Sequence, residues 1–311
     1  MSRDNQGSSR GGVREDAGPP ETGSEGGFGR VSRTKDYVFE NILRFASFVG
    51  VVALFILLIY VAIDSVGWLN IQFLTNPPSI IPEDAGIYPA LIGSFMLMIV
   101  VVVVSFPIGV GAAVYLEEYA PDNRWIRVIQ INISNLAGVP SVVYGILGLG
   151  VIVNVFGFGY GTVLTGGVTL SLLILPIVII SSREAIRSVP ENYREASYGM
   201  GATRWQTVRN VVLPEALPGI LTGTILSIGR ALGETAPLIV IGAPTTMFRA
   251  PAGFTDKVTA MPMQIFAWSD SAQPEFQHGV LAAAVVTLLV VLLLINSVAI
   301  YVRDRYERKG G

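Results

Sequence analysis

Between Val128 and Ser182 the chain carries no charged side chain for 55 consecutive residues. A helix needs about 20 apolar residues to cross the hydrocarbon core of a bilayer. The stretch is therefore long enough for two membrane spans, and its glycine-rich run 156–161 predicts the turn between them. Only 14% of all residues are charged, a composition that excludes a soluble domain of this size and is typical of a polytopic membrane protein.

Four further segments are apolar enough to cross the membrane, which gives an all-α protein with six transmembrane helices. They are residues 45–63, 85–116 (with a kink predicted at Pro107), 217–241 and 279–302. Fifteen Lys and Arg residues flank these spans on one face, whereas Arg249 and Lys257 alone fall on the other. The positive-inside rule then places both termini in the cytoplasm and predicts a multi-pass protein of the cell membrane.

The ends of the chain differ from the spans in composition. Residues 1–36 are rich in Gly and Ser and predict a disordered cytoplasmic tail, and residues 306–311 predict a second short tail around a permease domain at 37–305. The chain has no cysteine and the single histidine His278. We therefore expect no metal centre, no catalytic residues and no cofactor bound by this chain, and the net charge of -2 gives no indication of nucleic-acid binding.

The long polar segment 183–214, between spans four and five, predicts two short helices. Pro190 is suited to a helix start and Gly201 to a helix stop. Thr203 with Gln206 three residues later forms a capping-box pattern for the second helix, and Pro214 is expected to open span five. The pattern fits a rigid cytoplasmic docking element, or alternatively an amphipathic loop lying on the membrane surface.

Arg230 and Glu234 are charged residues inside span five. Charge at membrane depth is costly, so such residues usually face a partner or an aqueous path. The planar guanidinium fork of Arg230 suits a tetrahedral oxyanion, and Glu234, one turn away on the same helix face, could hold it between transport cycles. The alternative is a structural ion pair that packs span five against a neighbour.

Two weaker features complete the predicted substrate path and the outer surface. The Gly138–Pro140 sequence breaks span three and places the hydroxyls of Ser141 and Tyr144 beside the break. The alternative is that the small residues in this region serve helix–helix packing. The outer segment 242–277 is long for a connection and is either a plain connector or a docking surface for an outside partner.

The cytoplasmic segment resembles the EAA loop of ABC-importer permeases. Glu195-Ala196-Ser197, Gly201 and Val211-Val212-Leu213-Pro214 keep the spacing of that motif, with Ser197 and Val211 as small departures. The resemblance implies a MetI-like ABC type-I importer permease whose loop inserts into a cleft on a cytoplasmic ATPase subunit. The motif positions carried over to this chain are Glu195, Ala196, Gly201, Leu213 and Pro214.

Several other runs are similar to phosphate ABC-importer permeases of the PstA type. They are 88–93, 106–110, 115–120, 140–145, 229–238 and 263–266. This resemblance implies inorganic phosphate as substrate, a PstC-like permease as heterodimer partner, a PstB-like ATPase dimer that uses the ATP, and a PstS-like extracytoplasmic phosphate-binding protein. One departure is that family members often carry Arg near the end of span four, where this chain has Ile180, and Arg183 lies one turn further on.

Two other readings stay open at this point. A permease for another oxyanion, such as molybdate, tungstate or sulfate, would share most of these features. An ion channel or a membrane enzyme belongs to a different class: a channel needs no docking loop, and an enzyme needs a group of polar residues that the spans lack. The chain has no phosphate-binding nucleotide loop, so it is not expected to hydrolyse ATP alone.

Overall fold

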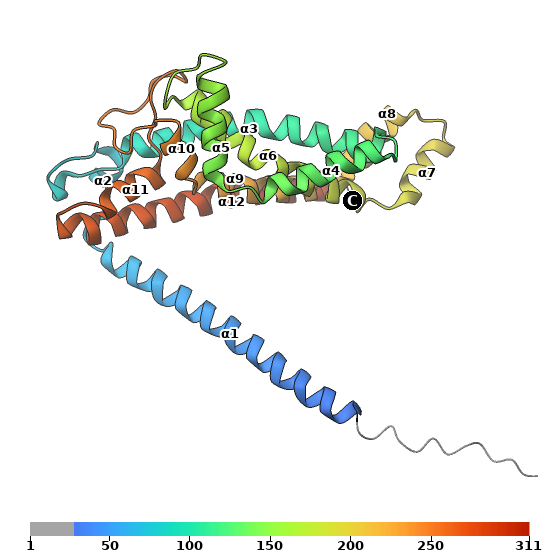
Figure 1. Cartoon of the computed structure of the whole chain (residues 1–311), viewed down its shortest axis with the longest axis horizontal. Helices are drawn as coiled ribbons and strands as arrows, with labels where there is room; N and C mark the ends of the chain where they lie inside the picture. The colour runs from blue at the N-terminus through green and yellow to red at the C-terminus, as the bar shows by residue number, and fades with distance from the viewer. Residues whose placement is uncertain (1–27, 311) are drawn as a thin grey trace, which may run out of the picture. The chain divides into compact units, whose positions relative to one another are not determined.

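The computed structural model describes residues 28–310 (Figure 1). The chain divides into two units, residues 1–58 and 59–311. Helix α1 (Phe28–Asp64) contains the first predicted span, 45–63. Residues 28–36 are already helical in α1, where disorder was expected, and the rest of the predicted tail, 1–27, lies outside the described residues.

Four long helices form the body of the second unit. They are α3 (Tyr88–Val114), α6 (Val163–Arg187), α9 (Leu213–Leu232) and α12 (Leu281–Gly310). Helix α6 packs against both α3 and α9, and α9 packs against α12. Glycine permits the close approach: a Cβ at Gly223 of α9 would lie 2.3 Å from the side chain of Ser181 on α6. Helix α6 is thus the central element of this unit.

The third predicted span is bent. Helix α4 (Arg124–Ala137) is followed by α5 (Ser141–Leu147), which continues as the π-helical η3 (Gly148–Val153), and the two parts meet at 107°. Pro140 cannot donate a backbone hydrogen bond, so the break predicted at 138–140 is confirmed. Among the described residues five helices are long and apolar enough to span a membrane, and the bent pair raises this number to six.

The fifth span differs from the prediction at both ends. A continuous helix runs from Arg204 to Leu232 through α8 (Arg204–Thr207), the π-helical η4 (Val208–Val212) and α9. Pro214 lies in the first turn of α9, as predicted, but no break separates α9 from η4 and α8 before it. The predicted span 217–241 is interrupted at Gly233, after which α10 (Ala236–Val240) begins.

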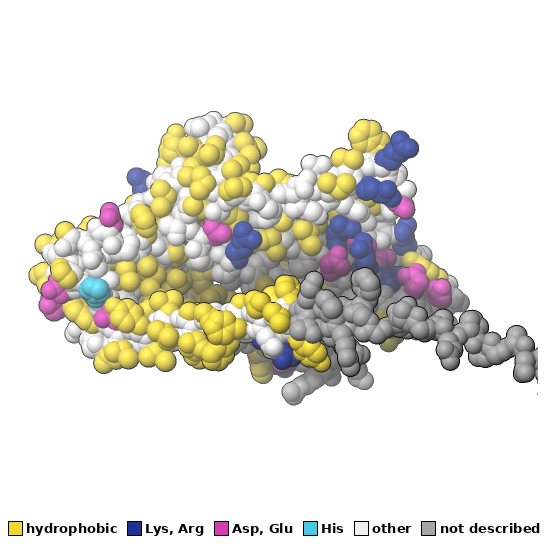
Figure 2. All heavy atoms as spheres, turned by 60° about the horizontal axis from the view of Figure 1, so that its bottom comes forward, with side chains coloured by type: hydrophobic (Ala, Val, Ile, Leu, Met, Phe, Trp, Pro, Cys, Tyr) yellow, Lys and Arg dark blue, Asp and Glu magenta, His cyan; other side chains and the backbone are white. Residues whose placement is uncertain are grey.

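Short elements gather at the two ends of the second unit (Figure 1). One end holds α7 (Glu191–Gly199) and α8, next to the π-helical η2 (Tyr115–Tyr119). The other holds α2 (Ile71–Thr75), η1 (Pro82–Asp84), α11 (Met261–Ser269) and η5 (Phe276–Val280). Figure 2 shows charged side chains gathered towards the α7–α8 end and hydrophobic ones over much of the remaining length.

The predicted outer segments lie together. The N–H of Val163 donates to Asp256 and the N–H of Val258 donates to Gly161, at 3.0 and 2.9 Å. Gly161 has a φ of +61°, which allows the turn 157–161 to reach the segment 242–277. The structure therefore pairs the two connections that the topology prediction placed on the same side.

Candidate functional site

Arg230 lies in the last turn of α9, where the helix ends at Leu232. Its Nε is 3.5 Å from Oε1 of Glu234, and the two side chains are 48% and 18% exposed. Glu234 was predicted on the same helix face, but it lies beyond the helix end, and its N–H donates to the carbonyl of Ala231 at 3.2 Å. The pair therefore forms across a helix terminus and leaves half of the guanidinium side chain uncovered.

The break in span three is close to this pair. Ser141 is the first residue of α5, and the buried Tyr144 donates its hydroxyl to the carbonyl of Leu136 on α4 at 2.9 Å. Tyr144 thus joins the two arms of the bent span. Tyr144 lies on α5, which packs against α10, the helix that begins two residues after Glu234. The place of Ser141, Tyr144, Arg230 and Glu234 in a substrate path stays a prediction.

Helices α5 and α10 pack directly against each other. A Cβ at Gly145 would lie 2.9 Å from Cα of Pro237 and 2.8 Å from Cβ of Val240. The helices that follow the two breaks, 138–140 in span three and 233–235 in span five, are therefore in contact. Backbone that leaves helical geometry at membrane depth is tolerated where protein or a cavity surrounds it, so this junction is the candidate substrate region.

The segment that resembles the EAA loop forms the predicted pair of short helices. Pro190 caps α7, Gly201 has a φ of +83°, and Thr203 and Gln206 form the capping box of α8. Glu195 and Ala196 are exposed on α7. The hydroxyls of Ser197 and Thr207 are 2.8 Å apart and join the two helices. Leu213 and Pro214 lie at the start of α9, further from the turn.

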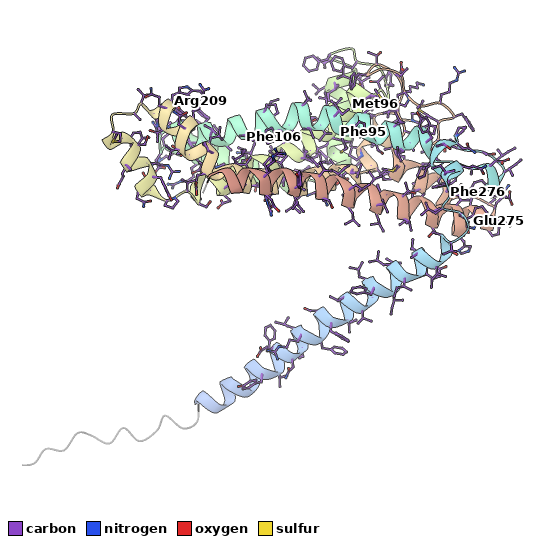
Figure 3. All side chains as sticks on the ribbon, turned by 180° about the vertical axis from the view of Figure 1, so that it is seen from behind. Phe95, Met96, Phe106, Arg209, Glu275 and Phe276 are labelled. Carbon is purple, nitrogen blue, oxygen red and sulfur yellow. The ribbon has the colours of Figure 1, made fainter. Side chains whose placement is uncertain are left out.

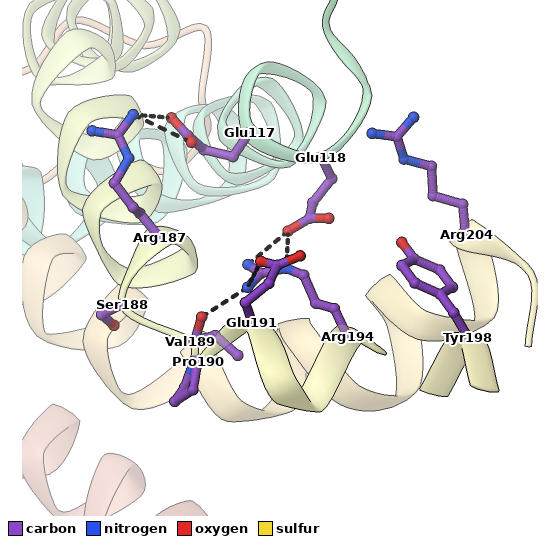
Figure 4. A pocket seen from close by; sticks show the side chains of 10 residues that line it. All are labelled: Glu117, Glu118, Arg187, Ser188, Val189, Pro190, Glu191, Arg194, Tyr198 and Arg204. Atoms are coloured by element: carbon purple, nitrogen blue, oxygen red, sulfur yellow. Dashed lines mark hydrogen bonds and ion pairs between the residues drawn. The ribbon is translucent and has the colours of Figure 1, made fainter. Parts of the chain in front are cut away.

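The sequence analysis missed two adjacent carboxylates, Glu117 and Glu118, which anchor this segment (Figure 4). Glu118 is 3.0 Å from Nη2 of Arg194 on α7, with side chains only 6% and 11% exposed. Arg194 also donates to the carbonyls of Val189 and Ile186, at 2.7 and 3.0 Å. One arginine thus ties η2, the end of α6 and α7 together.

The neighbouring carboxylate holds α6. Glu117 Oε1 is 2.6 Å from Nη2 of Arg183 and 3.0 Å from Nη2 of Arg187. Arg183 is 11% exposed and is held by Glu117 at the end of α6. A signal was present in the sequence. The first charged residues after the second span are the two acids Glu117 and Glu118, and the end of span four carries Arg183 and Arg187 one helical turn apart.

These residues border an open cleft of about 840 Å³ between η2, the end of α6 and α7. Arg204 at the start of α8 stacks on the ring of Tyr119, with its Cζ 5.2 Å from the ring centre. As Figure 4 shows, Glu118 and Arg194 are joined directly at the cleft, and Tyr198 lies near Arg204. The arrangement can fix the position of α7 and α8 relative to the spans.

The sequence profile of the family described as binding-protein-dependent transport system inner membrane component matches residues 105–309, well over half of the chain. This chain belongs to that family. The matched range of this chain includes Glu117 and Glu118, the segment with Glu195 and Gly201, and Arg230. The family comprises inner-membrane components of transport systems, and the long apolar helices of this chain agree with a place in a membrane.

Curated relatives give the same family. The chain is 40% identical over 187 residues to the probable ABC transporter permease protein YqgI of Bacillus subtilis, a match covering 60% of this chain and 63% of YqgI. It thus spans less than two thirds of that relative. It is 33% identical to phosphate transport system permease protein PstA 1 of Mycobacterium tuberculosis, covering 83% of this chain and 84% of the relative. The resemblance to PstA-type permeases is confirmed.

Solved structures confirm the predicted fold. A chain of a bacterial alginate ABC transporter, in complex with an alginate pentasaccharide-bound periplasmic protein, matches with a TM-score of 0.63 at 15% identity, over 88% of this chain and 96% of that one. A chain of the MetNI methionine ABC transporter matches with a TM-score of 0.55 at 19% identity, over 71% and 94%. The chain has the MetI-like permease fold.

Proposed function

We propose that this chain is the permease subunit of an ATP-driven importer of inorganic phosphate and forms half of its translocation pore. The 33% identity to PstA 1 over 83% of the chain supports phosphate as the substrate. The family match supports the transport role. The chain itself would carry no ATP hydrolysis and no cofactor.

The half-exposed guanidinium of Arg230 is the observation that carries the proposal. It offers donors in a planar fork that fits two oxygens of a tetrahedral oxyanion. Its bond to Glu234 is long, at 3.5 Å, so an arriving dianion can displace the carboxylate without breaking a buried ion pair. A single cation that is partly balanced binds an anion and also releases it, as conduction requires.

We assign each of the three expected partners to a region of this chain. A PstC-like permease completes the pore beside the exposed Arg230, and a PstB-like ATPase dimer engages the exposed α7 through Glu195 and Ala196. A PstS-like phosphate-binding protein meets the outer segment 242–277. In this arrangement both termini lie in the cytoplasm and the protein is a multi-pass component of the cell membrane.

The buried ion pairs support transmission between the ATPase and the pore. Glu118 holds Arg194 of α7, while Glu117 holds Arg183 of α6. Because α8 continues into α9, movement of the docking segment reaches Arg230 through one helix. A different oxyanion remains the second candidate, since the fork of Arg230 matches tetrahedral oxyanions in general.

Uptake into proteoliposomes tests the proposal. The chain is reconstituted with its partner permease, the ATPase and the binding protein, and radiolabelled phosphate is supplied with ATP inside. We expect phosphate accumulation that unlabelled molybdate or sulfate does not compete away. Labelled molybdate, tungstate or sulfate accumulating while phosphate does not would assign the second candidate instead.

A further inference from the structure

A pocket of about 270 Å³ is formed by the segment that follows the first span. Its lining comes from the turn after α1, from α2 and from η1, at the end of the second unit opposite α7 and α8. The main lining residues are Trp68, Asn70, Phe73, Pro82 and Glu83. The pocket therefore lies where the chain leaves its first apolar helix and folds back on itself.

Backbone and side-chain contacts hold two walls of the pocket together. Oδ1 of Asn70 accepts a hydrogen bond from the N–H of Phe73 at 2.8 Å and caps α2. The N–H of Ile87, just after η1, donates to the carbonyl of Phe73 at 2.8 Å. The ring of Phe73 is 6.1 Å from that of Trp268 and is only 3% exposed. The pocket is thus a built feature of the fold.

Trp68 forms the third wall and is held by η5. A Cβ at Gly279 would collide with the indole of Trp68, so the ring packs directly on the backbone of η5. Figure 3 places Phe276 of η5 at the end of the molecule far from Arg209. The indole therefore has a fixed place beside the pocket.

The chemistry of the lining selects a cation. Glu83 is the one charged residue among the residues that line the pocket, and its carboxylate is exposed. Trp is the best aromatic partner for a cation, and aromatic groups beside an acid are a recurrent way to bind ammonium groups. A phosphate ion would meet a carboxylate and no basic group here, so the pocket does not belong to the proposed substrate path. The volume suits one small headgroup.

The border of the pocket is apolar and close to the membrane surface. Val66, Leu69 and Ile71 are 76%, 43% and 75% exposed. Helix α1 ends at Asp64, and three further residues extend the chain by at most about 10 Å. Trp side chains are enriched at this depth, the boundary between hydrocarbon and water. Exposed apolar side chains around an acidic pocket suit a ligand with a cationic head and apolar tails, and not a dissolved amine.

We propose that this pocket binds the headgroup of a zwitterionic phospholipid. The ammonium group lies between Glu83 and Trp68, and the acyl chains run along Val66, Leu69 and Ile71. Such a lipid fastens the turn after the first span to η1 at the membrane surface. The inference does not depend on which ion is transported or on the partners assigned above.

The test uses the whole reconstituted complex in phosphatidylglycerol nanodiscs. A phosphatidylethanolamine with a photoreactive diazirine in one acyl chain is added at increasing mole fraction, and the labelled peptides are identified by mass spectrometry. We expect saturable labelling of the peptide that contains residues 66–71. Unlabelled phosphatidylethanolamine or phosphatidylcholine should compete, because both carry an ammonium group. A phosphatidylglycerol with the same diazirine should label this peptide without saturation.

Variants test the two groups that contact the ammonium. Glu83→Gln should raise the half-saturating mole fraction about five-fold, and Trp68→Leu should raise it about three-fold. Glu83 is exposed, so its replacement leaves the fold intact. Asp84→Asn is the matched control, since Asp84 is the next residue of η1 and is exposed, but lies outside the pocket lining. It should leave the mole fraction unchanged.

Three results would overturn the proposal. The first is saturable labelling by phosphatidylglycerol, which carries no ammonium group. The second is an unchanged half-saturating mole fraction in both Glu83→Gln and Trp68→Leu, or an equal shift in Asp84→Asn. The third is competition by dissolved phosphoethanolamine at the level of the lipid, which would assign the pocket to a soluble amine.

Discussion

Arg230 and Glu234 remain 3.5 Å apart even though the helix that carries Arg230 ends between them, at Leu232. An i,i+4 spacing inside a helix fixes two side chains on one face. Here the carboxylate instead hangs from the linker between α9 and α10, so its position depends on the fold of that linker. The pair can open without unwinding a helix.

Replacement of Arg230 by Gln should abolish nearly all phosphate uptake at matched membrane levels. The change keeps hydrogen-bonding capacity but removes the positive charge and leaves Glu234 to repel the anion. Radiolabelled uptake in proteoliposomes provides the measurement. Uptake at the wild-type rate would show that the pair is structural.

Replacement of Arg230 by Lys should give partial uptake at best, because an ammonium group cannot make the two-pronged contact. Glu234→Gln should reduce uptake less than Arg230→Gln does, since the carboxylate restrains the arginine without contacting the anion. The same uptake assay ranks the three variants. A ranking in which Glu234→Gln is the most damaging would contradict the assigned roles.

Loss of the buried pair between Glu118 and Arg194 should destabilise the docking segment. Arg194→Ala leaves a carboxylate that is only 6% exposed without its partner, a loss on the order of 3–5 kcal/mol. We expect a lower melting temperature and ATP hydrolysis that no longer drives uptake. Glu191→Gln is the control, because Glu191 is 72% exposed and such pairs contribute little.

Substitution at Gly201 should act through the backbone alone. Its φ is +83°, yet a Cβ there would meet no atom within 4 Å. Gly201→Val should therefore weaken the turn between α7 and α8, whereas Gly201→Asn, which tolerates positive φ better, should retain more transport. The ratio of phosphate transported to ATP hydrolysed is the measurement. Equal ratios for the two variants would exclude a conformational cause.

Contact between the helices that follow the two breaks, α5 and α10, can be tested at Gly145. Gly145→Ala would bring a methyl group within 3 Å of Pro237 and Val240, whereas Gly150→Ala on the following π-helical segment meets nothing within 4 Å. We expect the first variant to reduce phosphate uptake strongly and the second to leave it close to the wild-type rate. Both variants need comparison at equal amounts in the membrane. Equal uptake would show that the close packing of α5 on α10 is dispensable.

The sequence predicted the features that depend on local chemistry. The spans follow from uncharged length, the break at 138–140 from glycine and proline, and the α7–α8 turn from Gly201 and its flanking caps. The sequence did not predict that Pro214 lies within a continuous helix, because a π turn before it depends on packing as well as on propensity. Glu117 and Glu118 were missed as a site since their partners, Arg183 and Arg194, are distant in the chain and meet only after folding.

The unbroken helix from Arg204 to Leu232 extends for about 40 Å. In the proposed importer it would act as a lever, with one end in the docking segment and the other at Arg230. The two ends of a stiff helix cannot move independently. In the proposed importer the tilt of α8 and the position of Arg230 therefore change together. A tilt that the ATPase imposes on α8 would then move Arg230 directly, with no further hinge between the two within this helix.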